Sequence, residues 1–358
     1  MSAIAEILQK QSFSLNNIIT LLQSNGEDEK ILFEASKRIK LQHVEDKVYL
    51  RGLIELSNIC RKDCFYCGIR NSNSQITRYS LTDDEILAAS RYAMDKHFGS
   101  IVIQSGENNS PAFVERIEQL LKDIAMMSDS KLRVTLSLGE QTRETYLRWF
   151  NAGAQRYLLR IESSNRELYQ KLHPNNNNHS FDTRMNCLLT LKEIGYQLGT
   201  GVMIGLPFQT INDLANDLLF MQQLDIHMVG MGPFIEHAET PLYQYKETLP
   251  SLEDRFSLTL RMIATLRIMM KDINIASTTA LQAIDKLGRE KALRIGANVM
   301  MPNITPGKYR NDYKLYDNKP CTDDSADDCV NCMEVRVALS EGQIAWDEWG
   351  DSKHFKQS

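Results

Sequence analysis

Three cysteines near residue 60 are spaced as metal ligands. The segment Cys60-Arg-Lys-Asp-Cys64-Phe-Tyr-Cys67 places them in a C-x3-C-x2-C pattern. A 4Fe-4S cluster normally takes four cysteine ligands, so three thiolates leave one iron open for a ligand that takes part in chemistry. The alternative is a zinc site, but structural zinc usually has four ligands in paired units, and no fourth ligand follows nearby. We therefore predict a 4Fe-4S cluster with an open iron.

The other cysteines form a second group, Cys321, Cys329 and Cys332, and one isolated residue, Cys187. The N-terminus lacks the basic start and apolar run of a secretory signal, so we expect a cytoplasmic protein. Because the cytosol keeps thiols reduced, grouped cysteines there are better candidates for metal ligands than for disulfides. Cys187 lies in a stretch of helical periodicity and is predicted to be a buried structural thiol.

Charged and polar residues close three later strand-like runs. They are Ser105, Gly106 and Glu107, then Gly139 and Glu140, then Arg160 and Glu162. The two-residue period of a strand turns Arg160 and Glu162 to one side and Ile161 to the other. Salt bridges on a rim are the alternative, but charges gathered in this way favour a binding site. On the next strand-like run, the fifth along the chain, Gly201 and Gly205 would let the backbone approach a flat ligand, although glycine in strands also serves packing.

The elements that must position these residues alternate between short β-rich runs and amphipathic helices. This rhythm predicts an α/β protein with a single (β/α)8 TIM barrel, in which the active site lies at the carboxyl ends of the strands. We expect an N-terminal helical cap over 1–45, the barrel over 46–305 and a C-terminal, cysteine-containing extension over 306–358 near the barrel mouth. The predicted strands are 49–56, 100–104, 132–138, 157–161, 198–204, 228–231, 273–277 and 297–301.

The composition excludes two classes of partner. The chain has 358 residues, of which 42% are hydrophobic, and a formal net charge of -5. Nucleic-acid and anionic-membrane binders carry a basic surface, so an acidic chain without a lysine or arginine stripe predicts neither partner. No stretch approaches the roughly 18 apolar residues that span a bilayer.

With these features established, the cysteine motif and its preceding Tyr66 resemble the signature of the radical S-adenosylmethionine (SAM) superfamily. From about residue 50 onward, further segments resemble the HydE family of FeFe-hydrogenase maturases. Biotin synthase and methylornithine synthase share the motif and the barrel, but their later segments match less well. The segments that carry the resemblance are Glu55-Leu-Ser-Asn-Ile-Cys60, Gln104-Ser-Gly-Glu107, Thr135-Leu-Ser-Leu-Gly-Glu140, Arg156-Tyr-Leu-Leu-Arg160, Asn186-Cys-Leu-Leu-Thr-Leu-Lys192, Met228-Val-Gly-Met-Gly-Pro-Phe234 and Ala297-Asn-Val-Met-Met-Pro-Asn303.

This resemblance implies roles for individual residues. Glu107 is expected near the amino group of SAM, Glu162 at its ribose hydroxyls and Arg184 at its carboxylate. Carboxylates suit ammonium and hydroxyl donors, and a guanidinium suits a carboxylate. In the substrate pocket, Arg160 is expected to anchor a carboxylate, while Met228 is equally well explained as barrel core, as is Met301. The pocket implied by the family is lined by Arg160, Thr278, Thr279, Met228, Met301, Tyr313 and Tyr316.

The family also suggests cofactors and partners. The second cysteine group resembles an auxiliary site that holds a second iron-sulfur cluster in some members, with zinc or an empty loop as alternatives. Expected partners are a small-molecule or organometallic substrate, an electron donor such as flavodoxin or ferredoxin, and other hydrogenase maturases. One departure concerns Ile161, where members of the family often have histidine. If the strand alternation holds there, the change affects packing only, whereas a strand that frays at its end would let the change alter the choice of substrate.

Three hypotheses for function follow. The favoured one is a HydE-type enzyme that cleaves SAM reductively to a 5'-deoxyadenosyl radical and acts on a cysteine-containing iron carbonyl cyanide precursor of the hydrogenase di-iron centre. The second is radical chemistry on a free amino acid, as in methylornithine synthase. The third is a non-catalytic electron carrier or scaffold, and the open iron argues against it, because a carrier gains nothing from an unliganded position.

Overall fold

The computed structural model describes residues 2–322 and 326–355, and the side chains of 326–331 fall outside that description. Its centre is a parallel sheet with the strand order β10-β1-β2-β3-β4-β5-β7-β9. Each predicted strand region overlaps one of these strands. The strands are β1 (Lys47–Ser57), β2 (Ser100–Ser105), β3 (Arg133–Ser137), β4 (Arg156–Leu158), β5 (Gln197–Thr200), β7 (Met228–Val229), β9 (Asn274–Ile275) and β10 (Val299–Met300).

The two ends of this sheet meet and close a barrel. Ala276, which follows β9, forms a parallel bridge with Val299 of β10. The Asn298 N–H donates to the Ile275 carbonyl, and the Ser277 N–H donates to the Val299 carbonyl, each at 2.9 Å. Beyond β5 and β7, β6 (Met203–Ile204) pairs with β8 (Gly232–Pro233) and extends the wall. The (β/α)8 fold class predicted from the sequence is therefore confirmed, with β1 and β2 longer than the predicted runs and the later strands shorter.

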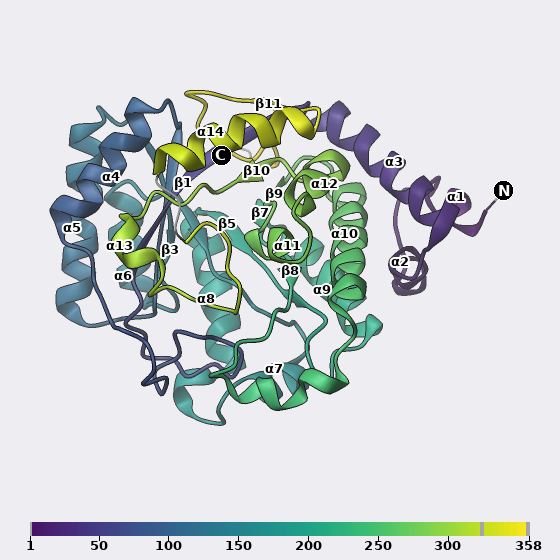
Figure 1. Cartoon of the computed structure of the whole chain (residues 1–358), viewed down its shortest axis with the longest axis horizontal. Helices are drawn as coiled ribbons and strands as arrows, with labels where there is room; N and C mark the ends of the chain where they lie inside the picture. The colour runs from purple at the N-terminus through teal and green to yellow at the C-terminus, as the bar shows by residue number, and fades with distance from the viewer. Residues whose placement is uncertain (1, 323–325, 356–358) are drawn as a thin grey trace.

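Helices surround the barrel (Figure 1), because each presents an apolar face to the strands and a polar face to water. Several begin at a side-chain cap. Thr82 accepts from the Glu85 N–H at 3.2 Å, and the Glu85 carboxylate accepts in return at 2.9 Å, which confirms the predicted capping box. No helix in the described ranges is long and apolar enough to cross a bilayer. The barrel helices are α4 (Asp83–Asp95), α5 (Pro111–Met127), α6 (Arg143–Asn151), α7 (Arg166–Leu172), α8 (Phe181–Ile194), α9 (Ile211–Leu224), α10 (Leu252–Met269), α11 (Thr279–Ile284) and α12 (Gly288–Ile295), with the 3-10 helices Asn177–His179 and Pro241–Thr248.

Three N-terminal helices precede the barrel and lie along its flank. They are α1 (Ala3–Ile7), α2 (Leu15–Leu22) and α3 (Gly26–His43). Ile4 and Leu32 pack with Ala264 and Ile268 of α10 in a small apolar cluster separate from the main core. In Figure 1 these helices, in purple, stand beside α10 and away from the strands. The predicted N-terminal helical segment is present, and it supports one side of the barrel.

The C-terminal extension reaches both ends of the barrel, whereas the sequence placed all of it near the mouth. Tyr313 and Cys321 line the cavity at the mouth. After α13 (Gly307–Arg310), α14 (Ala326–Leu339) and β11 (Gln343–Ile344), the last residues cover the amino ends of the strands. There the Gly350 carbonyl accepts from Arg51 at 2.9 Å, and Asp351 pairs with Arg156 at 2.8 Å. The correction has a physical cause, because these buried arginines need acceptors that only the tail provides.

His354 at the end of this tail predicts a pH-dependent stability. Its ring lies 2.8 Å from Asp225 and 2.7 Å from Asp272, and these carboxylates raise its pKa against the opposing effect of burial. A raised pKa means that the stabilisation is present below the unfolded pKa and is lost as the pH rises through the folded value. His354→Gln should therefore lower the free energy of unfolding by up to about 1 kcal/mol at pH 5.5 and by less at pH 8.5. Urea unfolding at both pH values tests this, and an equal loss at both would contradict it.

Candidate active site

The three cysteines of the first motif line one wall of a single cavity at the carboxyl end of the barrel. The cavity has a volume of about 390 Å³, within the range of small-molecule sites. Cys60, Cys64 and Cys67 all border it from the loop that follows β1. Gly106 lets the end of β2 approach that loop, because a Cβ there would lie 2.5 Å from the Ile59 carbonyl oxygen. The spacing in the sequence and the barrel topology thus bring all three thiols to one place.

The surroundings of these thiols fit an iron-sulfur cluster. The Sγ of Cys60 accepts from the backbone N–H of Lys62 at 3.4 Å and of Glu107 at 3.3 Å, and such bonds stabilise a ligating thiolate. Burial raises the pKa of Cys64 to about 12, and a cationic metal would stabilise its thiolate. Three thiols bordering one cavity suit a cluster, in which each binds its own iron, better than a structural zinc ion, which takes four protein ligands.

Most of the residues predicted from the sequence border the same cavity, and a few do not. Glu140, Gly201 and Gly205 do not line it, nor does Cys332, and the Cys329 side chain lies outside the described residues. Gly201 is instead required for packing, because a Cβ there would lie 2.1 Å from the Gly230 carbonyl oxygen. Besides the three cysteines, the predicted residues that border the cavity are Tyr66, Ser105, Gly106, Glu107, Arg160, Glu162, Arg184, Met228, Thr278, Thr279, Met301, Tyr313, Tyr316 and Cys321.

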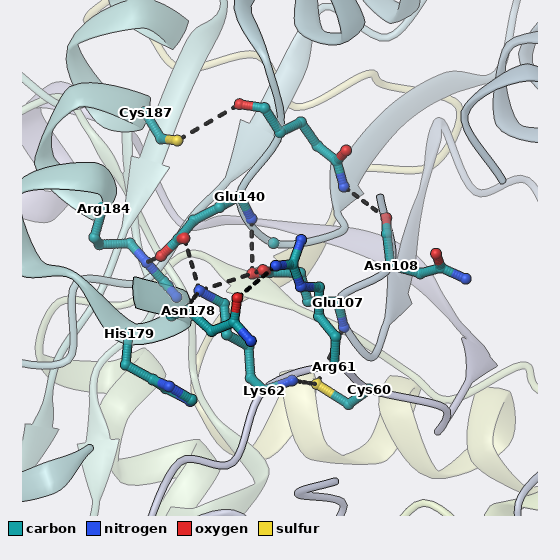
Figure 2. A network of polar contacts seen from close by, with 12 residues as sticks. Cys60, Arg61, Lys62, Glu107, Asn108, Glu140, Asn178, His179, Arg184 and Cys187 are labelled. Carbon is teal, nitrogen blue, oxygen red and sulfur yellow. Dashed lines mark hydrogen bonds and ion pairs between the residues drawn. The ribbon is translucent and has the colours of Figure 1, made fainter. Parts of the chain in front are cut away.

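A buried network of four charges lies beside the cysteine loop (Figure 2). The Lys62 Nζ is 2.7 Å from Glu140 and 3.3 Å from Glu107, and the Arg184 Nε donates to Glu140 at 2.6 Å. Burial raises the pKa of Glu107. Burial would also raise that of Glu140, but Arg184 and Lys62 hold the pKa of Glu140 below its usual value. Sequence reasoning missed Lys62, although a lysine between two cluster cysteines is a signal that could have marked it.

Arg184 keeps a donor for a ligand. Its Nε is bound to Glu140, and its Nη1 donates to the Arg160 carbonyl at 2.7 Å. Its Nη2 group makes no hydrogen bond with any described residue, while the side chain borders the cavity. Glu140 therefore orients this guanidinium from behind, in the way that a supporting residue orients a binding group.

The Arg160 and Glu162 side chains both border the cavity, as predicted, but the reason is not the predicted strand alternation, because β4 ends at Leu158. Ile161 between them is fully buried in the main core, so its difference from the family is a packing position. Glu162 forms a bidentate ion pair with Arg160, accepting from Nε at 2.8 Å and from Nη2 at 3.0 Å. Its backbone is in the left-handed region at φ 65°, which a non-glycine residue seldom adopts unless its surroundings require it. The Gly201 carbonyl fixes this backbone by accepting from the Glu162 N–H at 3.0 Å.

Two further polar contacts at the cavity were not predicted. The Tyr66 hydroxyl lies 3.1 Å from Nε2 of His173, whose Nδ1 donates to the Tyr169 carbonyl at 2.8 Å. Because Nδ1 carries the proton, Tyr66 donates to Nε2. Burial lowers the pKa of His173 to about 3, so the ring stays neutral. Tyr66 therefore presents its ring to the cavity with its hydroxyl already satisfied.

The second polar contact joins Lys319 of the C-terminal extension to Glu55 at the end of β1. The Lys319 Nζ lies 2.5 Å from the Glu55 carboxylate and donates to the Tyr313 carbonyl at 2.8 Å. Asn303 donates to the other Glu55 oxygen at 3.0 Å. All four side chains border the cavity. This buried ion pair ties the extension to the barrel mouth, so that Tyr313 closes the cavity.

The second cysteine group is only partly described. Cys321 borders the cavity, and Cys332 on α14 accepts a hydrogen bond from the Arg336 Nε at 3.0 Å. A second iron-sulfur cluster stays a prediction. Changing Cys321, Cys329 and Cys332 together to serine should lower the iron content of reconstituted protein while SAM cleavage continues, because these residues lie beyond the barrel strands. Iron counting and 5'-deoxyadenosine release test this. Equal iron contents would reject the second cluster, and loss of product would reject its dispensability.

Comparison with known proteins agrees with this site. The model of the Radical SAM superfamily matches residues 54–221. The chain is 44% identical over 352 residues to the [FeFe] hydrogenase maturase subunit HydE of Thermotoga maritima, covering 98% of this chain and 97% of the relative. It is 27% identical to 3-methylornithine synthase of Methanosarcina acetivorans, covering 82% of this chain and 81% of the relative.

Solved structures share the fold. Methylornithine synthase (PylB) superposes with a TM-score of 0.79 over 97% of this chain and 98% of that chain, at 24% identity. The maturase HydG from Carboxydothermus hydrogenoformans also gives 0.79, over 96% of this chain and 79% of that chain, at 20% identity. The family identity rests on the sequence match, since these structures are more distant. With its cysteine loop, its barrel and this match over nearly its whole length, the chain belongs to the radical SAM superfamily and, within it, to the HydE family.

Proposed function

We propose that this radical SAM enzyme is a maturase of the HydE type, which acts on a cysteine-containing iron carbonyl cyanide precursor in the assembly of the FeFe-hydrogenase active site. The observation that carries the proposal is one cavity that is bordered by the three thiols and, over most of its surface, by apolar atoms. When bound, a reduced cluster and SAM supply a 5'-deoxyadenosyl radical and methionine. The chain's own residues then bind and orient SAM and the substrate and keep water away from them.

Cys60, Cys64 and Cys67 would hold three irons and leave the fourth for SAM. Glu107 would accept from the SAM amino group, and Arg184 would direct its remaining Nη2 donors at the SAM carboxylate. Both side chains are buried and held by Lys62 and Glu140, so little reorganisation is needed on binding. Glu162, fixed by its backbone, would accept from the ribose hydroxyls through the lone pairs that Arg160 leaves available. Together these contacts support SAM at the side of the cavity formed by β2, β3 and β4.

Enclosure is the second contribution of the chain. The pocket beyond the charged side is bordered by Met228, Met301 and Leu158, and Tyr313 packs over it with only 1% of its surface exposed. Excluding water protects a carbon radical from side reactions. An electron donor such as flavodoxin or ferredoxin and the other maturases would act from outside the cavity, as partners that deliver electrons or receive the product.

A free amino acid as substrate is the second candidate, favoured by the close superposition on methylornithine synthase. A direct comparison separates the two candidates. Anaerobically reconstituted enzyme with dithionite and SAM is given either a thioether amino acid, S-methyl-L-cysteine, or L-lysine. The proposal expects the thioether to stimulate 5'-deoxyadenosine release, because the deoxyadenosyl radical becomes 5'-deoxyadenosine when it takes a hydrogen atom from the thioether. Stimulation by lysine alone would reject it in favour of the amino-acid mutase.

A further inference from the structure

Arg289, the second residue of α12, carries a buried guanidinium at the edge of the cavity. The residue is 1% exposed and borders the cavity. Its Nε and Nη2 groups have no hydrogen-bond partner among the described residues. Buried donors in native proteins are almost always paired, and a buried charge without a partner is strongly unfavourable. Such a group needs an explanation, and an anionic ligand supplies one.

The other cations at the cavity are already matched by carboxylates. Arg289 forms no ion pair in the described part of the chain. Its neighbour Glu290 turns to Arg336, whose Nη1 lies 2.5 Å away. Positive charge is therefore left over at Arg289 alone among the described cavity residues. The matched pairs are Lys62 with Glu107 and Glu140, Arg184 with Glu140, Arg160 with Glu162, and Lys319 with Glu55.

Arg160, the carboxylate anchor expected from the sequence, differs from Arg289 in this respect. Its fork is held by Glu162, and it also donates to the Gly230 carbonyl at 2.6 Å and to the Val202 carbonyl at 2.9 Å. Four of its five N–H donors are thus engaged, and its charge is balanced by one carboxylate. An incoming anion would meet a neutral pair at Arg160 and an uncompensated cation at Arg289.

Hydrogen bonds around Arg289 hold its backbone in place and leave a hydroxyl donor for an anion nearby. The Ser277 hydroxyl donates to the Arg289 carbonyl at 2.9 Å and ties α12 to the end of β9. Gly288 lets the start of α12 approach α11, because a Cβ there would lie 2.3 Å from the Leu281 carbonyl oxygen. Nearby, the Thr279 and Tyr316 hydroxyls are 2.8 Å apart, so one of the two keeps a proton to donate to a ligand. In the strand order, β9 lies across the barrel from β3, which places Arg289 away from the Glu140 network.

We propose that Arg289, together with the Thr279 and Tyr316 hydroxyls, binds a carboxylate of the substrate. The ligand class is a small, α-amino-acid-derived carboxylate whose remaining part reaches across the apolar pocket. The inference rests on the proposed function only in taking this cavity as the substrate pocket. It assigns the carboxylate to the side of the barrel opposite the SAM contacts, so that the reacting part of the substrate lies between the two.

Binding of two matched carboxylates to the reconstituted, SAM-loaded enzyme tests the proposal by calorimetry. The probes are S-methyl-L-cysteine and its sulfur-free isostere L-norvaline, with L-norvalinamide as the probe that lacks the carboxylate. Wild type should bind both carboxylates, and Arg289→Gln should weaken both by about tenfold to a hundredfold, the range of a charge-assisted hydrogen bond. Arg289→Lys should recover part of the loss. Arg294→Gln, on the outer face of the same helix, should bind as wild type does.

Several results would overturn the proposal. The first is that wild type binds neither carboxylate measurably. The second is that norvaline and its amide bind equally well. The third is that Arg160→Gln weakens binding of the carboxylates while Arg289→Gln does not. Failure of the proposed function is a separate outcome. Norvaline binding that still depends on Arg289, with no stimulation of SAM cleavage by S-methyl-L-cysteine, would reject the maturase chemistry and leave this inference standing.

Thermal unfolding of the ligand-free protein distinguishes a binding role from a structural one. If the role of Arg289 is to bind a ligand, Arg289→Met removes an uncompensated buried charge from the ligand-free protein. Its melting temperature should then stay the same or rise. The increase in melting temperature that norvaline causes in wild type should disappear in this variant. If Arg289→Met instead lowers the melting temperature of the ligand-free protein by several degrees, Arg289 is structural and the proposal fails.

Discussion

Changing any one of Cys60, Cys64 and Cys67 to alanine is expected to abolish SAM cleavage. Two thiolates cannot support a cube that already leaves one iron open. Anaerobically reconstituted protein reduced with dithionite should release 5'-deoxyadenosine from SAM, and each variant should release none above background. We expect a loss of at least about a hundredfold, because removing a metal ligand affects every turnover.

Cys187→Ala is the matched control for this experiment. Its thiol is buried in the main core, donates to the Gln141 carbonyl at 3.6 Å and does not border the cavity. The variant should keep its iron content and its SAM cleavage, with a modest loss of stability from the small cavity left behind. Unchanged deoxyadenosine release from the triple alanine variant of the first motif would reject the cluster assignment altogether.

Changing Arg184 to glutamine is expected to weaken SAM binding by about a hundredfold and to destabilise the protein. The first effect follows from losing a charge-assisted bond to the SAM carboxylate, which contributes roughly 1.5 to 3 kcal/mol. The second follows because Glu140 would keep only Lys62 as its partner. Removing one partner of a buried ion pair lowers the free energy of unfolding by up to about 3 to 5 kcal/mol. Equilibrium binding of SAM and urea unfolding measure the two effects separately.

A double variant separates the two roles of Arg184. Adding Glu140→Gln removes the unpaired carboxylate, so the double variant should regain much of the stability lost in Arg184→Gln while SAM binding stays weak. Arg166→Gln serves as the control, because Arg166 forms an exposed pair with Asp182 and does not border the cavity. Recovery of SAM affinity together with stability would show that Arg184 acts only through the fold, and the assignment to the SAM carboxylate would be lost.

The fold class, the cysteine motif and several helix starts could be predicted from the sequence. Strands and capped helices depend on neighbouring residues and on the two-residue and 3.6-residue periods, and the sequence contains both. For that reason the Thr82 capping box was predicted correctly. Arg160 and Glu162 border the cavity as predicted, but β4 ends at Leu158, so the strand period is not the cause. The same local signals could not show where the strands stop, because strand ends depend on pairing with neighbours.

The pairing of the charges became known only from the folded structure. Lys319 meets Glu55 across 264 positions of sequence, and Lys62 meets Glu140 across 78. Composition and spacing give no sign of these pairings, since they arise when the barrel closes and the extension folds over its mouth. The same closure leaves Arg289 buried with two unpartnered donor groups. Whether a charge needs a ligand depends on its burial and on its distance to every other charge, and a sequence contains neither quantity until the chain folds.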